Sequence, residues 1–176
     1  MAKFVPDLKT KRWVIVASGR VSRPHDNTTV PEEEKGNEHE HEEAKPTPVV
    51  TPEQLKKCPF EPGNESMNPI ELFRMGGANG DPNWRIRVIA NKYPITDLHE
   101  VIIHSPDHLK DIDELPQEHV ELLFQTYRQR YNYHMHEGNG QVIIFNNHDA
   151  HAGASLRHPQ HTNILPLTQN NTQKLS

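Results

Sequence analysis

Apolar residues occur in short runs along this chain, and most of these runs have the composition of β-strands. Strand-forming residues occupy 13–16, directly after a turn at 7–11. Alternation of apolar and polar residues predicts a strand over 84–90, and further apolar runs predict strands over 100–104 and 141–145. A loop of small residues that begins at Ala152 leads into a last strand, which ends near 167.

One long segment has the pattern of a helix. Pro116 suits a first helical position, and the segment after it carries acidic residues early and arginines late, as the helix dipole favours. Apolar residues recur there at three and four positions, which predicts one apolar stripe. The stripe consists of Val120, Leu123, Phe124, Tyr127 and Tyr131. Strands before and after a single helix predict the α+β class, an antiparallel sheet with the helix on one face.

An acidic segment rich in His and Glu interrupts the chain at 25–52. It has almost nothing to bury, so we expect it to be a disordered insertion. The predicted domain is therefore made of 1–24 and 53–167, and the polar residues 168–176 are expected to fray. Four histidines in polar surroundings are interpreted as solvated surface residues, with weak binding of stray metal as the alternative: His39, His41, His134 and His136.

Composition excludes several classes of protein. Hydrophobic residues make up 33% of the 176, and no apolar run approaches the roughly 20 residues of a membrane helix, so no membrane partner is expected. A net charge of −5 argues against a nucleic-acid partner, although arginines can still line a small anion pocket. The single cysteine excludes an internal disulfide framework and favours a cytoplasmic location. The thirteen histidines are more than average composition gives, so some of them are candidates for a functional site.

Cysteine, glutamate and histidine occur at spacings that suit a zinc site. Cys58 and Glu61 are three residues apart, so one turn can present both to an ion. His108, in a turn that ends a predicted strand, and either His158 or His161 would bring the ligands to four. The same residues are also compatible with a buried cysteine and an exposed glutamate that bind nothing.

Two loops carry residues suited to phosphate. Arg20 and Arg23 are three residues apart in one loop, and planar guanidinium groups bind phosphate oxygens well. Asn147, Gly153 and Ser155 belong to a small-residue loop whose backbone N–H groups can approach an anion. A solvated arginine pair and an ordinary connecting loop are the alternatives.

The segment after this loop holds a candidate nucleophile. His158 and His161 lie close together, and a neutral imidazole can accept and release a phosphoryl or nucleotidyl group near pH 7. The alternative is a surface histidine on an edge strand.

The motifs follow one another in the order of a known family. The chain resembles the N-terminal half of a galactose-1-phosphate uridylyltransferase, a branch of the histidine-triad superfamily. The resemblance covers nearly the whole of the expected ordered chain. It is carried by KRWVIV (11–16), GRVSRP (19–24), CPFEPGNE (58–65), WRIRVIANKYP (84–94), HEVIIHSPDH (99–108), FNNH (145–148) and AGASLRHP (152–159).

The resemblance implies a histidine-triad-like half of an enzyme of galactose metabolism. Such enzymes transfer a uridylyl group between UDP-hexose and hexose 1-phosphate through a uridylyl-histidine intermediate. They have two similar halves and usually form dimers, so the expected partner is a second copy or a C-terminal half. The positions that match zinc ligands are Cys58, Glu61, His108 and His158. The positions that match nucleotide-binding residues are Arg20, Arg23, Asn91, Asn147, Gly153 and Ser155.

Two single residues depart from the family pattern. Glu61 stands where the family often has the second cysteine of Cys-x-x-Cys, and zinc accepts such an oxygen ligand. Asp149 stands where a glycine is common and adds negative charge near the phosphate loop.

The largest departure is at the nucleophile, where the family has His-Pro-His-x-Gln. Without a gap, Gln160 takes the place of the nucleophile, and an amide cannot form the covalent intermediate. With one inserted residue, His161 is the nucleophile and Asn163 replaces the glutamine as a substrate-binding residue. The following Ile-Leu favours the gap, whereas strand alternation opposes it unless a bulge intervenes. The first alignment predicts a catalytically silent nucleotide- and zinc-binding half-domain, and a related nucleotide-sugar phosphorylase is a further alternative to the uridylyltransferase.

Overall fold

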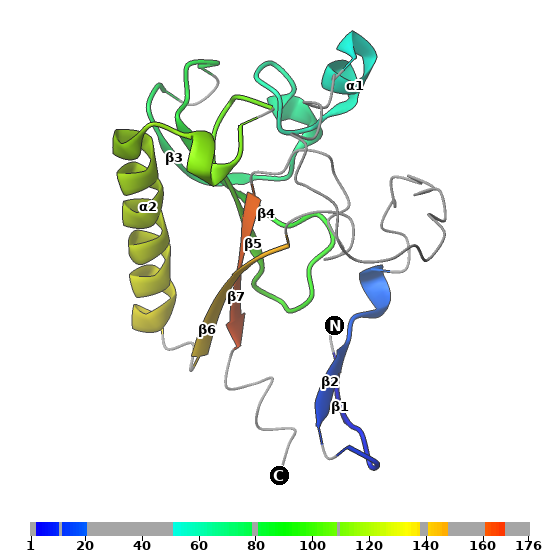
Figure 1. Cartoon of the computed structure of the whole chain (residues 1–176). Coiled ribbons are helices and arrows are strands. Elements are labelled where there is room, and N and C mark those ends of the chain that lie inside the picture. The colour runs from blue at the N-terminus through cyan, green and yellow to red at the C-terminus, as the bar shows by residue number, and fades with distance from the viewer. Residues whose placement is uncertain are drawn as a thin grey trace, which may run out of the picture.

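A five-stranded antiparallel sheet with one long helix against it forms the body of the protein (Figure 1). The computed structural model describes residues 3–10, 12–20, 51–78, 81–108, 110–137, 141–147 and 161–167. The helices are α1 (Pro52–Lys57) and α2 (Gln117–His136), with short 3-10 turns at Ser18–Arg20, Glu65–Met67 and Ile112–Glu114. The strands are β1 (Lys3–Pro6), β2 (Trp13–Val16), β3 (Glu71–Met75), β4 (Ile86–Ala90), β5 (Glu100–Ile103), β6 (Gln141–Asn146) and β7 (His161–Leu167). The α+β class predicted from the sequence is confirmed.

The large sheet has the strand order β3-β4-β5-β7-β6, with all neighbours antiparallel. β7 is thus inserted between β5 and β6, and its first residues pair with both. Pro166 lies opposite Val142 of β6 but beyond the stretch of β7 that pairs with β5, which ends at Ile164. A proline without an N–H is tolerated there because only one of its two sides belongs to a ladder. The predicted strands are all present, and β1 and β3 are additional.

β1 and β2 form a separate two-stranded hairpin beside the large sheet (Figure 1). The predicted turn between them is built on Asp7. Its carboxylate accepts from the Lys9 N–H at 2.9 Å and from the Thr10 hydroxyl at 2.6 Å, and these bonds lower the pKa of Asp7. The hairpin leads directly into the 3-10 turn that carries Arg20.

The central strands are buried on both faces, which the alternating pattern did not predict. Ile86 and Val88 of β4 pack toward α2 together with Leu123, whereas Ile89 lies in a second cluster on the opposite face. Arg87, the polar residue between them, is 1% exposed rather than solvated. The second cluster also holds Cys58, Phe60, Trp84, Val101 and Ile103, so the chain around Cys58 covers the face of the sheet that α2 leaves open.

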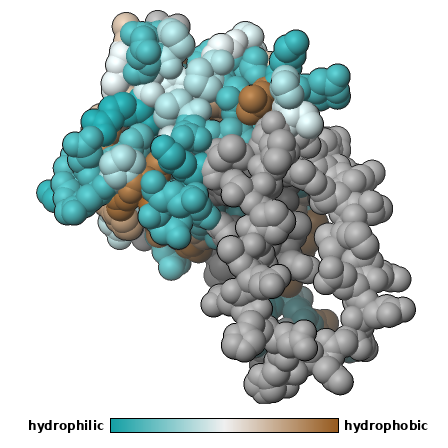
Figure 2. All heavy atoms as spheres, turned by 45° about the horizontal axis from the view of Figure 1, so that its top comes forward, coloured by the Kyte–Doolittle hydropathy of each residue, from teal (hydrophilic) through white to brown (hydrophobic). Residues whose placement is uncertain are grey.

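The helix buries only part of the predicted apolar stripe. Leu123 is fully buried, but Phe124 and Tyr131 are 57% and 40% exposed, so the prediction is wrong for them. The residues that α2 buries recur at three and four positions but are mostly polar: His119, Leu123, Thr126, Arg130 and His134. Space-filling representation shows hydrophilic side chains over much of the described surface, with apolar ones exposed between them (Figure 2).

Residues 25–50 of the predicted insertion and the predicted frayed end lie outside the described residues. Pro52, assigned to the insertion, instead begins α1. Within the described part of the chain, neither helix is long and apolar enough to cross a membrane.

Candidate functional site

The turn that carries Cys58 and Glu61 is held by one amide. Asn64 Nδ2 lies within hydrogen-bonding distance of three carbonyl oxygens and is nearest that of Cys58, at 2.8 Å. The Asn64 N–H in turn donates to the Glu61 carbonyl oxygen at 3.0 Å. The positive φ of Gly63, 92°, completes the reversal of the chain, in a conformation that L-residues with a Cβ adopt with strain. The sequence Glu-Pro-Gly-Asn therefore folds locally into a rigid support for the two side chains.

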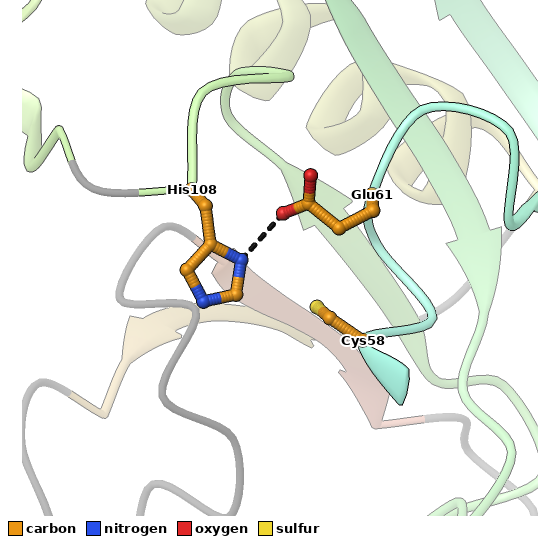
Figure 3. A group of neighbouring side chains, drawn as sticks. All are labelled: Cys58, Glu61 and His108. Atoms are coloured by element: carbon orange, nitrogen blue, oxygen red, sulfur yellow. Dashed lines mark hydrogen bonds and ion pairs between the residues drawn. The ribbon is translucent and has the colours of Figure 1, made fainter. Parts of the chain in front are cut away.

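Three side chains with different donor atoms converge at this turn. The ligand atoms of Cys58, Glu61 and His108 all lie within 4.8 Å of one another (Figure 3). His108 follows β5, and its Nδ1 is 2.5 Å from Glu61 Oε1. Cys58 and His108 are buried and Glu61 is half-buried. Residues 47 positions apart in the chain thus meet in a protected cluster, as the sequence predicted for these three.

The donor set of this cluster fits a zinc-type ion. Thiolate sulfur, imidazole nitrogen and carboxylate oxygen are the three ligand classes of zinc, at about 2.0 to 2.3 Å from the metal. Glu61 and His108 share a hydrogen bond that a bound ion would replace. The 2.5 Å between their two atoms is shorter than the separation of two donors around a tetrahedral ion, so binding would move them apart. The fourth predicted ligand, His158, lies outside the described residues.

A second set of predicted residues is connected by hydrogen bonds and one close polar contact. Arg20 Nη1 donates to the carbonyl oxygen of Tyr93 at 2.7 Å, which fixes the end of the hairpin to the loop after β4. The Tyr93 N–H donates to Asn91 Oδ1 at 2.8 Å. Asn91 Nδ2 lies 3.1 Å from His99 Nε2, and the same nitrogen lies 3.0 Å from Asn163 Oδ1. Three predicted nucleotide-binding residues, Arg20, Asn91 and Asn163, therefore belong to one network.

The other predicted residues are only partly described. Asn147 follows β6 and is half-buried, and the pairing of Asn146 with Thr162 places it near the start of β7. His161 is the first residue of β7, opposite Ile103 of β5. Arg23, Gly153, Ser155, His158 and Gln160 lie outside the described residues, as do His39, His41 and Asp149.

Two features of this region were missed from the sequence. His99, quoted only as part of a motif, connects Asn91 to Asn163 and is 5% exposed. On the opposite face of β7, Thr162 Oγ1 is 2.6 Å from the Tyr127 hydroxyl and 2.8 Å from His104 Nε2. A signal existed for both, because each histidine flanks a buried strand where a polar side chain requires a partner.

Burial keeps the Tyr127 hydroxyl in its neutral form. Burial raises the pKa of Tyr127 to about 12, against the smaller opposing effect of its bond to Thr162. The hydroxyl is thus protonated at all physiological pH values, and it holds α2 against β7 directly behind the proposed site.

The prediction that His134 is solvated is wrong. His134 is 2% exposed, and its Nε2 lies 2.8 Å from Glu100 Oε1. Arg130 approaches the same carboxylate with Nε at 2.9 Å and Nη2 at 2.5 Å. Burial alone would raise the pKa of Glu100, but the bonds from His134 and Arg130 outweigh it and lower that pKa. His136 is exposed, as predicted.

Comparison with known proteins relates this geometry to enzymes. No family model matches the chain. It is 28% identical over 184 residues to an ADP-glucose phosphorylase of Arabidopsis thaliana, covering 92% of this chain and 47% of the relative. The chain thus spans about half the length of the curated relative it matches.

Solved structures show a similarity to the same kind of protein. The crystal structure of that phosphorylase with bound ADP-glucose is 26% identical, with a TM-score of 0.56 over 98% of this chain and 51% of the other. A GalT-like protein of Arabidopsis thaliana is 30% identical, with a TM-score of 0.57 over 68% of this chain and 46% of the other. A uridylyltransferase mutant shares the fold, at 18% identity and a TM-score of 0.57 over 99% of this chain and 48% of the other. The resemblance to galactose-1-phosphate uridylyltransferases indicated by the sequence is confirmed.

Proposed function

We propose that this chain is the active-site half of an enzyme that transfers a nucleotidyl group from a nucleotide sugar. The observation that carries the proposal is the network of hydrogen bonds and close polar contacts that connects Arg20, Asn91 and Asn163. These three residues match nucleotide-binding positions of the uridylyltransferase family and come from three distant parts of the sequence. The similarity to a phosphorylase solved with ADP-glucose supports a nucleotide sugar as the substrate class.

His161 is the proposed nucleophile, and the register of β7 supports this choice over Gln160. The ungapped alignment would place Thr162 at the family's glutamine, but Thr162 is bonded to Tyr127 of α2 on the far side of the sheet. The gapped alignment places Asn163 there, and Asn163 lies beside His99 in the nucleotide network. Positions 161 and 163 lie on one face of the strand because consecutive strand residues alternate. The gapped alignment therefore puts both functional positions on the same face.

The reaction proceeds in two displacements. A lone pair on the His161 ring attacks the α-phosphorus of the nucleotide sugar, an N–P bond forms, and the P–O bond to the β-phosphate breaks. Sugar 1-phosphate leaves with that electron pair. A phosphate oxygen of the acceptor then attacks the same phosphorus, and the N–P bond breaks to regenerate the neutral imidazole. Arg20 and Arg23, with the loop of Asn147, Gly153 and Ser155, are the proposed groups that stabilise charge on the phosphates.

Zinc is the proposed resident metal, held by Cys58, Glu61, His108 and His158. Bound at this turn, the ion would supply a structural cross-link between chain segments. Cys58, Glu61 and His108 support it by their donor types and their approach within 4.8 Å. Their role is to fix the 58–61 turn against the segment that follows β5.

The pair of donor and acceptor distinguishes two candidate activities. With UDP-glucose as donor and galactose 1-phosphate as acceptor, the enzyme is a hexose-1-phosphate uridylyltransferase of galactose metabolism. With ADP-glucose as donor and inorganic phosphate as acceptor, it is a nucleotide-sugar phosphorylase. The 28% identity to an ADP-glucose phosphorylase favours including this second candidate. A homodimer or a C-terminal half is the proposed partner, and the proposed location is the cytoplasm.

The test combines both donors with both acceptors. Purified chain is incubated with each sugar nucleotide labelled at the α-phosphorus, and transfer of label to each acceptor is measured. We expect transfer for one donor–acceptor pair, its loss in His161→Asn, and its retention in the exposed control His136→Asn. Nucleotide binding by calorimetry without any transfer would instead support the catalytically silent half-domain.

A further inference from the structure

His99 lies at the centre of the nucleotide network without belonging to any predicted site. It directly precedes β5 and is 5% exposed. Asn91 follows β4, and Asn163 belongs to β7, so the ring bridges segments from three strands. The backbone also holds His99 beside Asn91, because the Asn91 N–H donates to the His99 carbonyl oxygen at 2.7 Å.

The hydrogen bonds of the ring determine its tautomer. The Ile95 N–H points at His99 Nδ1 over 3.0 Å, so Nδ1 must accept. In the neutral ring the single hydrogen is then on Nε2, which donates to Asn163 Oδ1 at 3.0 Å. Asn91 Nδ2 lies 3.1 Å from this nitrogen in a close polar contact and not a hydrogen bond, because both nitrogens then carry hydrogens, and Asn91 Oδ1 accepts from the Tyr93 N–H.

This tautomer also orients the Asn163 amide. Its oxygen is bound to the ring, so its NH2 group is directed elsewhere. An amide in this orientation offers hydrogens to oxygen acceptors such as phosphate, whereas the flipped amide would offer a lone pair and repel them. A histidine that donates from Nε2 disfavours the flipped form, because a flipped amide would remove the Asn163 oxygen that accepts this hydrogen and place a second NH2 group beside that of Asn91.

We propose that His99 is a positioning residue of the nucleotide site: it fixes the Asn163 amide so that its N–H groups donate to the bound nucleotide. His99 itself does not contact the nucleotide. The inference rests on the proposed function, because it requires that nucleotide binds beside Asn163.

Two substitutions separate positioning from packing. In His99→Gln the longer amide can still place an N–H near the position of Nε2 and donate to Asn163. In His99→Asn the shorter amide retains an acceptor for the Ile95 N–H but does not reach Asn163. If His99 served only to accept the Ile95 N–H, glutamine and asparagine would replace it equally well, or asparagine would replace it better.

The measurement is the affinity for UMP and AMP by titration calorimetry, with thermal melting alongside. We expect His99→Asn to weaken binding of the preferred nucleotide by about tenfold, the value of one hydrogen bond to a charged group, and His99→Gln to restore most of it. His119, a buried histidine bonded to the His104 carbonyl at 2.7 Å on the α2 side, gives the control: His119→Asn should lower the melting temperature and leave affinity unchanged.

A double-mutant cycle with Asn163→Ala tests whether His99 acts through Asn163. In the Asn163→Ala background, His99→Asn should have no further effect on affinity. Additive losses would overturn the proposal. Should His99→Asn fail to fold, Asn163→Asp decides the question: it keeps the acceptor for His99 but has no N–H to donate, so nucleotide affinity close to wild type would overturn the proposal. A folded wild-type chain that binds neither nucleotide would overturn the proposed function, and this inference with it.

Discussion

The replacement Arg130→Met tests the ionic contact that fastens α2 to the sheet. The guanidinium of Arg130 is 8% exposed and binds both oxygens of the Glu100 carboxylate, which is 4% exposed. Methionine fills a similar volume but leaves the buried carboxylate with His134 as its remaining partner among the described side chains that bond to it. The carboxylate cannot regain water at this depth, so the loss is that of an uncompensated buried charge.

The expected magnitude follows from this burial. Breaking a buried ion pair by removing one partner costs about 3 to 5 kcal/mol. For a chain of this size, each kcal/mol shifts the melting temperature by roughly 2 to 4 °C, so Arg130→Met should lower it by about 6 to 20 °C. Arg128, exposed on the same helix, provides the matched control, and Arg128→Met should change stability by less than about 0.5 kcal/mol.

Urea unfolding at several pH values is the assay. The pKa of Glu100 is lowered in the folded protein, so its contribution to stability is present above its ordinary value of 4.5 and is lost as pH falls through the lower folded value. The difference in unfolding free energy between wild type and Arg130→Met should therefore be largest at neutral pH and shrink in acid below pH 4.5. Equal effects of the Arg130 and Arg128 replacements at neutral pH would refute the reasoning.

Three further predictions concern other parts of the structure. Cys58→Ser should abolish the zinc bound per chain in elemental analysis while His136→Ala retains it, and full occupancy in Cys58→Ser would contradict the ligand assignment. Gly63→Ala should lower the unfolding free energy by about 1 to 2 kcal/mol because of the positive φ, whereas Gly19→Ala, with nothing within 4 Å, should not; equal effects would count against the strained turn. Because the pKa of Tyr127 rises from 10.0 to about 12 on folding, stability should decline as pH rises through this range, and Tyr127→Phe should remove that part of the decline in alkaline unfolding curves; an unchanged profile would refute the assignment.

Local sequence patterns were sufficient for β2, for β4 to β7 and for the position of the helix, because these depend on period and on end signals, but they missed β1 and β3. They were insufficient for the face that α2 buries. Phe124 and Tyr131 are apolar yet exposed, while Arg130 and His134 are buried through Glu100. Such burial depends on a partner 30 or more residues away, which no local window contains.

The residues of the candidate site were likewise only partly predictable from the sequence. Cys58 and Glu61 could be paired from their spacing, and His108 joined them through the family motif. The bonding partners of His99 could not be predicted, since they come together only when β4, β5 and β7 are side by side. The proposal of His161 over Gln160 likewise rests on the register of β7, in which Thr162 bonds to Tyr127 of α2 and Asn163 lies beside His99 on the opposite face.

The central claim, covalent transfer through His161, is tested most directly by mapping the adduct. The chain is mixed with UDP-glucose or ADP-glucose labelled at the α-phosphorus, quenched under alkaline conditions that preserve N–P bonds, digested and analysed by mass spectrometry. We predict one nucleotidyl group on the peptide that contains His161, with the modification on that residue, and none in His161→Asn. Absence of an adduct in a chain that binds the same nucleotide, or an adduct on another residue, would contradict the account.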